Sequence, residues 1–243
     1  MLKSRKALSE VVSTVIIAGS LLVMAAIASW LAVSMFEVQS QQAELERAKE
    51  AFKNLAEAIE DVAAKPGASA YVRFSPRAGG VEIQQDYATI TVTIGSFSYS
   101  DTIGAIRYRG GPYASVSSRV IIRGGAGTNS HIVGDSETPI VWVYTDPAKG
   151  KYVYLDTARV KVTELGTITV NGDTYKVVEV LLIKLEYGSA SSAAIVDTKV
   201  SCVSKNVTVI SGSSITINVN GDSLPLGNCV VYFIVSTVRV DFV

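Results

Sequence analysis

The apolar residues of this chain change their spacing twice, and each spacing predicts a different element. Across residues 11–36 no position is charged, which makes an uninterrupted, mainly apolar run of about 26 residues. A helix over this run rises about 1.5 Å per residue and is about 39 Å long, more than the roughly 30 Å hydrocarbon core of a membrane. The run therefore predicts a transmembrane helix.

After this run the apolar residues narrow to a stripe with helical spacing. The stripe consists of Val38, Leu45, Ala48, Phe52, Leu55, Ile59 and Val62. Charged residues lie mostly off this seam, so residues 37–65 are predicted to continue the same helix in amphipathic form, and Pro66-Gly67 to end it. A helix over 8–65 would be about 87 Å long, too long for a domain of this size to bury. We expect the C-terminal domain to cover the distal seam, and lipid or neighbouring chains to cover about half of the helix.

From Ala68 onward the pattern is that of β-strands. Runs rich in β-branched and aromatic residues cover 71–74, 87–94, 116–122, 140–144, 152–155, 159–162, 175–185, 214–219 and 230–240. Turn signals separate these runs, and Asn171-Gly172 is the best candidate for a two-residue hairpin of type I′. Because no helical crossover is readable between strands, we predict an α+β chain in which an antiparallel β-sandwich, immunoglobulin-like or similar, occupies 66–243. A division into two subdomains near 188–193 stays open.

A basic stretch with a small residue precedes the apolar run. It contains Arg5 and Lys6, followed by Ala7 and Leu8. In a secretory signal peptide the cleavage site follows the apolar stretch, so cleavage discards the hydrophobic helix. Here a cut between Ala7 and Leu8 would keep that helix. The arrangement of Lys6-Ala7 followed by residues 8–17 resembles the class III signal peptide of archaeal type IV pilin-like proteins, in the pilin and archaellin superfamily.

This resemblance covers about the first 35 residues and has several implications. It implies a leader peptide over 1–7 that a membrane prepilin peptidase removes, and a helix over 8–36 that spans the membrane and later forms a filament core. It also implies a homopolymer built by an assembly ATPase and a membrane platform. Bacterial pilins have a glutamate at the fifth mature position, whereas Glu10 would be the third. The alternative is an uncleaved signal anchor with a positive-inside basic flank.

Assembly through this helix would depend on packing and polar registration. Apolar area that is already buried in lipid gains little from entering a helix bundle, so small residues such as Ala18, Gly19 and Ser20 would favour close approach. After cleavage the amine of Leu8 and the carboxylate of Glu10 could pair between adjacent subunits. Because an unpaired charge in a low-dielectric core is costly, such a pair would penalise a wrong stagger.

Composition and motifs narrow the classes of function. The formal net charge is +0 and only 18% of residues are charged, so no basic excess attracts nucleic acid. The single histidine, His131, cannot build a zinc site with two distant cysteines, and the glycine-rich stretch 124–127 lacks the lysine of a phosphate-binding loop. We therefore expect no enzymatic activity, no metal and no cofactor.

The basic residues before the helix also predict the orientation of the chain. By the positive-inside rule the N-terminus lies in the cytoplasm and the β domain outside, where a disulfide is permitted. Cys202 and Cys229 allow one intrachain bridge, which would contribute about 3 kcal/mol in the chain-entropy model; the alternative is two buried free thiols. Asn206-Val207-Thr208 matches the acceptor pattern for N-glycosylation.

Together these features predict a structural subunit of an extracellular type IV pilus-like filament. The precursor would reside in the cell membrane and the mature subunit in the filament, with surface adhesion as the usual outcome for such proteins. The alternative is a non-polymerising, membrane-anchored β-sandwich, such as a minor pilin, an accessory protein or an envelope-binding protein. A third interpretation is a carbohydrate-binding or hydrolytic domain, for which an aromatic platform would have to form from Tyr108, Tyr113, Trp142 and Tyr144.

Overall fold

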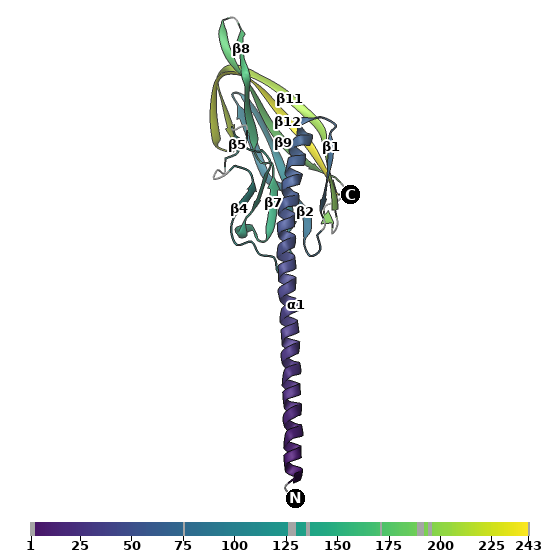
Figure 1. Cartoon of the computed structure of the whole chain (residues 1–243). Coiled ribbons are helices and arrows are strands. Elements are labelled where there is room, and N and C mark those ends of the chain that lie inside the picture. The colour runs from purple at the N-terminus through teal and green to yellow at the C-terminus, as the bar shows by residue number, and fades with distance from the viewer. Residues whose placement is uncertain are drawn as a thin grey trace.

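One long helix leads into a single large β-sheet (Figure 1). The computed structural model describes residues 3–74, 76–125, 130–134, 137–170, 172–188, 192–193 and 196–242. Helix α1 spans Lys3–Ala64, and its 62 residues give a rod of about 93 Å. The strands are β1 (Ser69–Phe74), β2 (Gly80–Ile94), β3 (Phe97–Arg109), β4 (Val120–Arg123), β5 (Ile132–Val133), β6 (Trp142–Thr145), β7 (Tyr152–Asp156), β8 (Val160–Val170), β9 (Asp173–Tyr187), β10 (Ser192–Ala193), β11 (Val196–Val219) and β12 (Asp222–Phe242), with a 3₁₀ turn, η1, at Pro147–Lys149.

The helix ends where the sequence predicts. Lys65 N–H donates to the carbonyl of Val62 at 3.1 Å, and Gly67 adopts a φ of 77°, in the left-handed region that glycine tolerates. The α+β prediction is therefore confirmed in its coarse form, a long apolar helix followed by a mostly antiparallel sheet. The helix is continuous from Lys3, so residues 3–7 of the predicted leader belong to the same rod.

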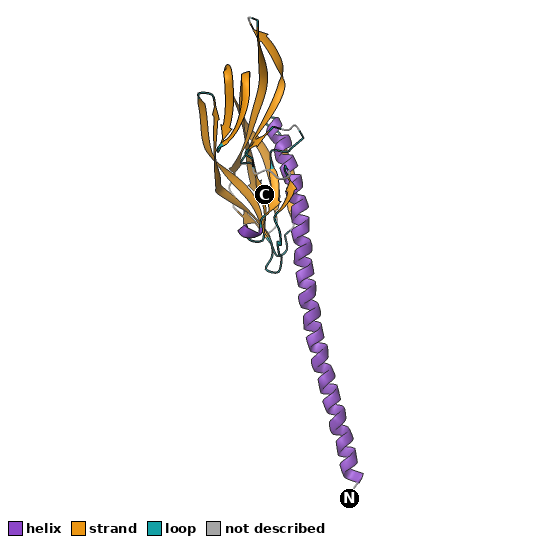
Figure 2. Cartoon of the chain, turned by 90° about the vertical axis from the view of Figure 1, so that its left-hand side faces the viewer, coloured by secondary structure: helices purple, strands orange, loops and turns teal. Residues whose placement is uncertain are grey.

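The predicted sandwich of two sheets is not confirmed. The described strands form one twelve-stranded sheet in the order β4-β6-β7-β3-β2-β11-β12-β9-β8-β5, with β1 added to β11 and β10 to β2. This sheet curls like half of a barrel (Figure 2). The strands on both sides of the proposed subdomain division near 188–193 belong to this one sheet, although much of that segment lies outside the described residues.

The expectation of purely antiparallel pairing is wrong for two pairs. Strand β12 runs parallel to β9 over twelve residue pairs, and β5 runs parallel to β8. A helical crossover is not needed between β9 and β12, because β11 itself returns the chain before the β11–β12 hairpin reverses it again. Asn220 and Gly221 close that hairpin with φ values of 48° and 97°, as a type I′ turn requires.

Two hydrophobic cores lie on opposite faces of the sheet. Strand β12 contributes Val238 and Val240 to a core that contains α1, and Val231 and Phe233 to a second core. Even and odd positions of a strand point to opposite faces, so the sheet separates the two cores. In the second core the curled sheet packs on itself.

Contacts between β3 and the β9–β12 part of the sheet show this closure. The ring centroids of Phe97 and Phe233 lie 5.6 Å apart, and Lys184 Nζ contacts the carboxylate of Asp101 at 2.6 Å. The sheet therefore needs no second sheet to bury its inner face.

Candidate assembly surface

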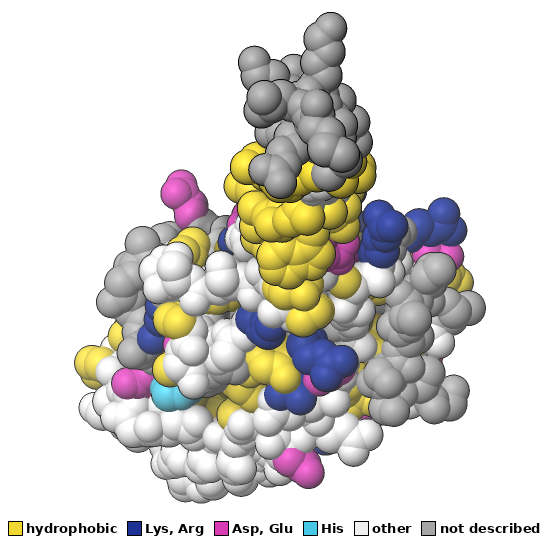
Figure 3. All heavy atoms as spheres, turned by 90° about the horizontal axis from the view of Figure 1, so that it is seen from below, with side chains coloured by type: hydrophobic (Ala, Val, Ile, Leu, Met, Phe, Trp, Pro, Cys, Tyr) yellow, Lys and Arg dark blue, Asp and Glu magenta, His cyan; other side chains and the backbone are white. Residues whose placement is uncertain are grey.

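The N-terminal part of α1 stands away from the domain with its apolar side chains uncovered. Between residues 12 and 36, fourteen large apolar side chains are each 47 to 72% exposed. Seen along the helix from its N-terminal end, these side chains form a hydrophobic column that rises from the base of the domain, where Lys and Arg side chains gather around it (Figure 3). We call residues 12–36 the bare segment. Among the described residues this is the one helix that is long and apolar enough to cross a membrane.

The distal part of α1 is buried against the sheet. The seam residues Leu45, Phe52, Leu55 and Ile59 are fully buried, while Val38 at its start is 43% exposed. The ring of Phe52 lies at the centre of this contact, with edge-to-face neighbours at 5.4 and 6.4 Å. The prediction that the C-terminal domain covers the distal seam is therefore confirmed.

Polar contacts fix the helix where it meets the base of the domain. Gln41 is buried, and its Oε1 accepts a hydrogen bond from the backbone N–H of Tyr113 at 2.7 Å. Its Nε2 donates to Glu37 at 2.7 Å. A Cβ at Gly111 would lie 2.5 Å from Gln41 Oε1, so a larger residue there would have to displace the amide of Gln41.

One turn further along, Glu44 holds the loop between β1 and β2. Its carboxylate accepts backbone N–H groups from Arg77 and Gly79 at 3.0 Å and from Ala78 at 3.1 Å, and also the hydroxyl of Tyr108. Burial raises the pKa of this carboxyl, but the hydrogen bonds from Tyr108 and the three N–H groups outweigh burial and leave the pKa below its ordinary value. The ionised form of Glu44 is thus part of the folded state.

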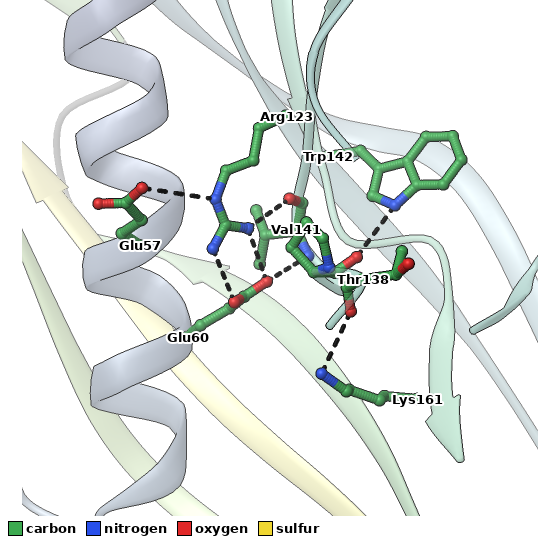
Figure 4. A network of polar contacts seen from close by, with 8 residues as sticks. Glu57, Glu60, Arg123, Thr138, Val141, Trp142 and Lys161 are labelled. Atoms are coloured by element: carbon green, nitrogen blue, oxygen red, sulfur yellow. Dashed lines mark hydrogen bonds and ion pairs between the residues drawn. The ribbon is translucent and has the colours of Figure 1, made fainter. Parts of the chain in front are cut away.

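A third set of polar contacts lies near the C-terminal end of the helix (Figure 4). We call the contacts of Gln41, of Glu44 and of Glu60 the three helix clamps. Arg123 on β4 donates through both terminal nitrogens to the carboxylate of Glu60, each at 2.9 Å. Glu60 also accepts the backbone N–H of Val141 at 2.8 Å, while Glu57 lies 3.9 Å from Arg123 Nε. Both groups of the central pair are largely buried, with 24% of Glu60 and 14% of Arg123 exposed.

These clamps give the bare segment a fixed direction relative to the domain. Gln41, Glu44 and Glu60 span about 29 Å of the helix axis at 1.5 Å per residue. A helix held at three levels cannot swing away without breaking charged or buried hydrogen bonds. The sequence prediction placed Glu44 and Glu60 off the seam and did not identify their partners, because Tyr108, Arg123 and the β1–β2 loop come from distant parts of the chain.

The predicted processing and assembly residues lie within α1. Arg5, Lys6, Ala7, Leu8 and Glu10 have helical backbone, and their side chains fall outside the described part of the structure. Cleavage at Ala7–Leu8 and pairing between the new amine and Glu10 therefore stay predictions.

The predicted disulfide is wrong in this structure. Both cysteines are free and buried, Cys202 in the core beside α1 and Cys229 in the second core. Cys202 pairs with Val238 across β11 and β12, nine positions along β12 from Cys229. At about 3.3 Å per residue this separation is about 30 Å, whereas a disulfide requires Cα atoms within about 7 Å.

The other predicted features are scattered over the sheet. Asn206 is exposed on β11, so the side chain of the glycosylation motif is accessible; its modification stays a prediction. Tyr108, Trp142 and Tyr144 are buried and only Tyr113 is exposed, so these four aromatic residues do not form an open platform.

The single histidine has a local partner. The backbone N–H of His131 donates to the carboxylate of Asp222 at 2.6 Å, and its ring Nδ1 lies 3.1 Å from the same oxygen. Within the described residues no group of three or more His, Cys, Asp or Glu side chains could hold a metal ion.

Comparison with known proteins identifies a family for most of the chain. No curated protein and no solved structure matches it. One family model, described as a family of unknown function (DUF7289), matches residues 6–180. The matched range contains the bare segment, all three helix clamps and the strands from β1 to the first half of β9. The chain therefore belongs to the DUF7289 family.

Proposed function

We propose that this chain is a structural subunit of an extracellular type IV pilus-like filament. The precursor is inserted in the cell membrane, a prepilin peptidase cuts it between Ala7 and Leu8, and the mature chain assembles through its N-terminal helix. An ATPase and a membrane platform drive this assembly, and the filament serves surface adhesion. The observation that carries the proposal is a single rigid helix whose distal half is fixed to its own domain and whose proximal half is bare.

The energetic cost of the bare segment supports a permanent apolar environment. Fully burying a large apolar side chain contributes roughly 1.5–3 kcal/mol, so fourteen side chains that are about half exposed or more leave on the order of 10–20 kcal/mol unrealised in water. This is comparable with the whole stability of a domain, roughly 5–15 kcal/mol. Lipid before assembly and neighbouring helices afterwards would both supply such an environment.

The fixed direction of the helix also suits a filament subunit. If the bare segments of many copies form a central bundle, the three clamps carry the orientation of the bundle to each β domain. Small residues along the segment, including Ala18, Gly19, Ala25 and Ala28, allow helices to approach closely. A flexible joint between helix and domain would lose this register.

The decisive experiment is mass spectrometry on sheared, purified surface filaments. We expect the filaments to contain this polypeptide with Leu8 as its first residue. An intact Met1 in a monodisperse, detergent-soluble population without filaments would refute the proposal and favour a non-polymerising membrane anchor, whose bare segment lipid alone would cover. In filament-forming cells, Glu10→Gln should lower filament yield or disturb register, and unchanged yield and register would exclude the pairing of Leu8 with Glu10.

A further inference from the structure

The helix covers only part of the sheet face on which it packs. On this face Val238 of β12, Cys202 of β11 and Leu185 of β9 are buried in the core that contains α1. The cover ends at Ser236, whose hydroxyl donates to the carbonyl of Ala63 at 2.8 Å, one residue before the helix ends. The strands continue well past this point, and the β8–β9 hairpin reaches the end of the molecule farthest from the N-terminus (Figure 1).

Beyond the helix end, the same face presents apolar side chains without a cover. Across β11 and β12 the register pairs Val207 with Ile234 and Val209 with Tyr232. Ile234, beside the helix end, is 6% exposed, whereas Tyr232 is 37%, Val207 54% and Val209 58% exposed. On β12 exposure therefore rises from Ile234 to Tyr232, away from the last turn of α1, and the paired residues of β11 are exposed at both levels.

The projecting β8–β9 hairpin extends this face. Tyr232 pairs with Glu179 of β9, and Tyr175 lies four positions earlier on the same side of that strand. Ile168 of β8 is the cross-strand partner of Tyr175 and is 42% exposed; Val170, two positions on, is 47% exposed. We call Ile168, Val170, Tyr175, Val207, Val209 and Tyr232 the uncovered face.

On β9 and β12 the reverse side is already occupied. Val178, Val180, Val231 and Phe233 alternate with the residues of the uncovered face and are buried in the second core. On these two strands the apolar exposure is therefore on the side on which α1 packs. A polar surface would be expected there if water were its permanent neighbour.

We infer that the bare segment of a second copy packs on the uncovered face. This inference rests on the proposed function and names the contact between neighbouring subunits. The uncovered face continues an interface that already receives an α-helix, and α1 of the same copy ends at Ala64 and extends away from it. A copy displaced along the helix direction presents residues 12–36, which are apolar and exposed.

Such a contact also accounts for an open polymer. The two surfaces differ, one being a helix and the other a sheet face, so the contact is head-to-tail rather than self-complementary. After two copies bind, one of them still has a free bare segment and the other still has a free uncovered face. A repeated contact of this type that does not close into a ring builds a filament.

A photo-reactive phenylalanine derivative in place of Tyr232 tests the contact directly in the full-length chain. Tyr71 provides a matched control, because it is 64% exposed on β1 and its neighbours Ala70 and Val72 pack toward α1, which places Tyr71 on the opposite face. After irradiation of purified filaments, position 232 should give cross-linked dimers in which the partner peptide lies within residues 12–36. Position 71 should not give this product.

Lysine substitutions on the uncovered face provide a second test of the contact. Val209→Lys combined with Tyr232→Lys should lower filament yield more than tenfold, whereas Tyr71→Lys should not, and both proteins should melt close to the wild-type temperature because the sites are exposed. Filaments of the double variant at wild-type yield, or dimers joined only through β-strand peptides, would overturn the inference while leaving the proposed function intact. Wild-type filaments that give no 232 cross-link to residues 12–36 would also overturn the inference alone, whereas absence of wild-type filaments with Met1 retained would refute the proposed function and, with it, any contact between copies.

Discussion

The clamp between Glu60 and Arg123 should contribute measurably to the attachment of the helix. Glu60→Gln keeps the size of the side chain and removes its charge, so Arg123 loses a two-bond partner while only 14% of its side chain reaches water. Hydrogen bonds to charged groups contribute about 1.5–3 kcal/mol each, and the neutral amide of glutamine retains part of that interaction. We therefore expect a loss of about 2–3 kcal/mol in the free energy of unfolding.

The size of this effect can be read from thermal and denaturant unfolding of the full-length chain in detergent. For a protein of this length, 1 kcal/mol corresponds to about 2–4 °C in melting temperature, so the variant should melt roughly 4–12 °C below wild type. Glu57→Gln is the matched control, because Glu57 is 52% exposed and lies 3.9 Å from Arg123. It should change the free energy by less than about 0.5 kcal/mol.

A double-mutant cycle with Arg123→Met isolates the pair. If the two groups act through each other, the coupling free energy should reach about 1–3 kcal/mol. Glu60→Gln that unfolds with the same midpoint as Glu57→Gln would refute the reasoning, because the clamp would then contribute no more than an exposed ion pair.

Three further outcomes follow from the same contacts. Phe52→Ala should cost about 3–5 kcal/mol in urea unfolding because the ring is fully buried, whereas Phe36→Ala, at a side chain that is 69% exposed, should leave domain stability unchanged; equal effects would contradict the division of α1 into bare and packed parts. Glu44 has a lowered pKa in the folded state, so its contribution is fully present above its ordinary value of 4.5 and is lost as pH falls through the folded value. The urea midpoints of wild type and Glu44→Gln should therefore differ more at pH 6 than at pH 3, and a difference that grows on acidification would show the opposite sign. Alkylation of the unfolded, unreduced chain should label both Cys202 and Cys229, since the register holds them far apart; a mass without two labels would show that one of the thiols is blocked.

Strands were missed where consecutive polar residues interrupt the alternation of apolar and polar positions. The sequence pattern does not predict β3 or the first part of β11 as strands. In β11, Ser204, Lys205 and Asn206 are three consecutive polar residues, so the alternation that follows over Val207 to Val209 is too short to predict a strand. Tertiary context extends the strand there by pairing it with β12 over most of its length.

The cysteine prediction failed for a different reason. Two cysteines in a domain that is predicted to lie outside the cell satisfy every local condition for a bridge, but the distance between them depends on register. The pairing of β11 with β12 places Cys202 opposite Val238 and includes a register shift between Cys202 and Ser204. This pairing depends on both strands together. No pattern in a single strand contains this information.

The amino-acid sequence by itself determined the long helix, its apolar and amphipathic parts, its end at Pro66-Gly67 and the change to strands beyond. These features arise from local periodicity and turn chemistry, which act between residues a few positions apart. Only the tertiary structure decided that the sheet curls on itself, that β9 and β12 run parallel, and that Glu60 meets Arg123. It also decided which apolar surfaces stay uncovered, because exposure depends on where a helix of given length ends relative to strands that continue past it.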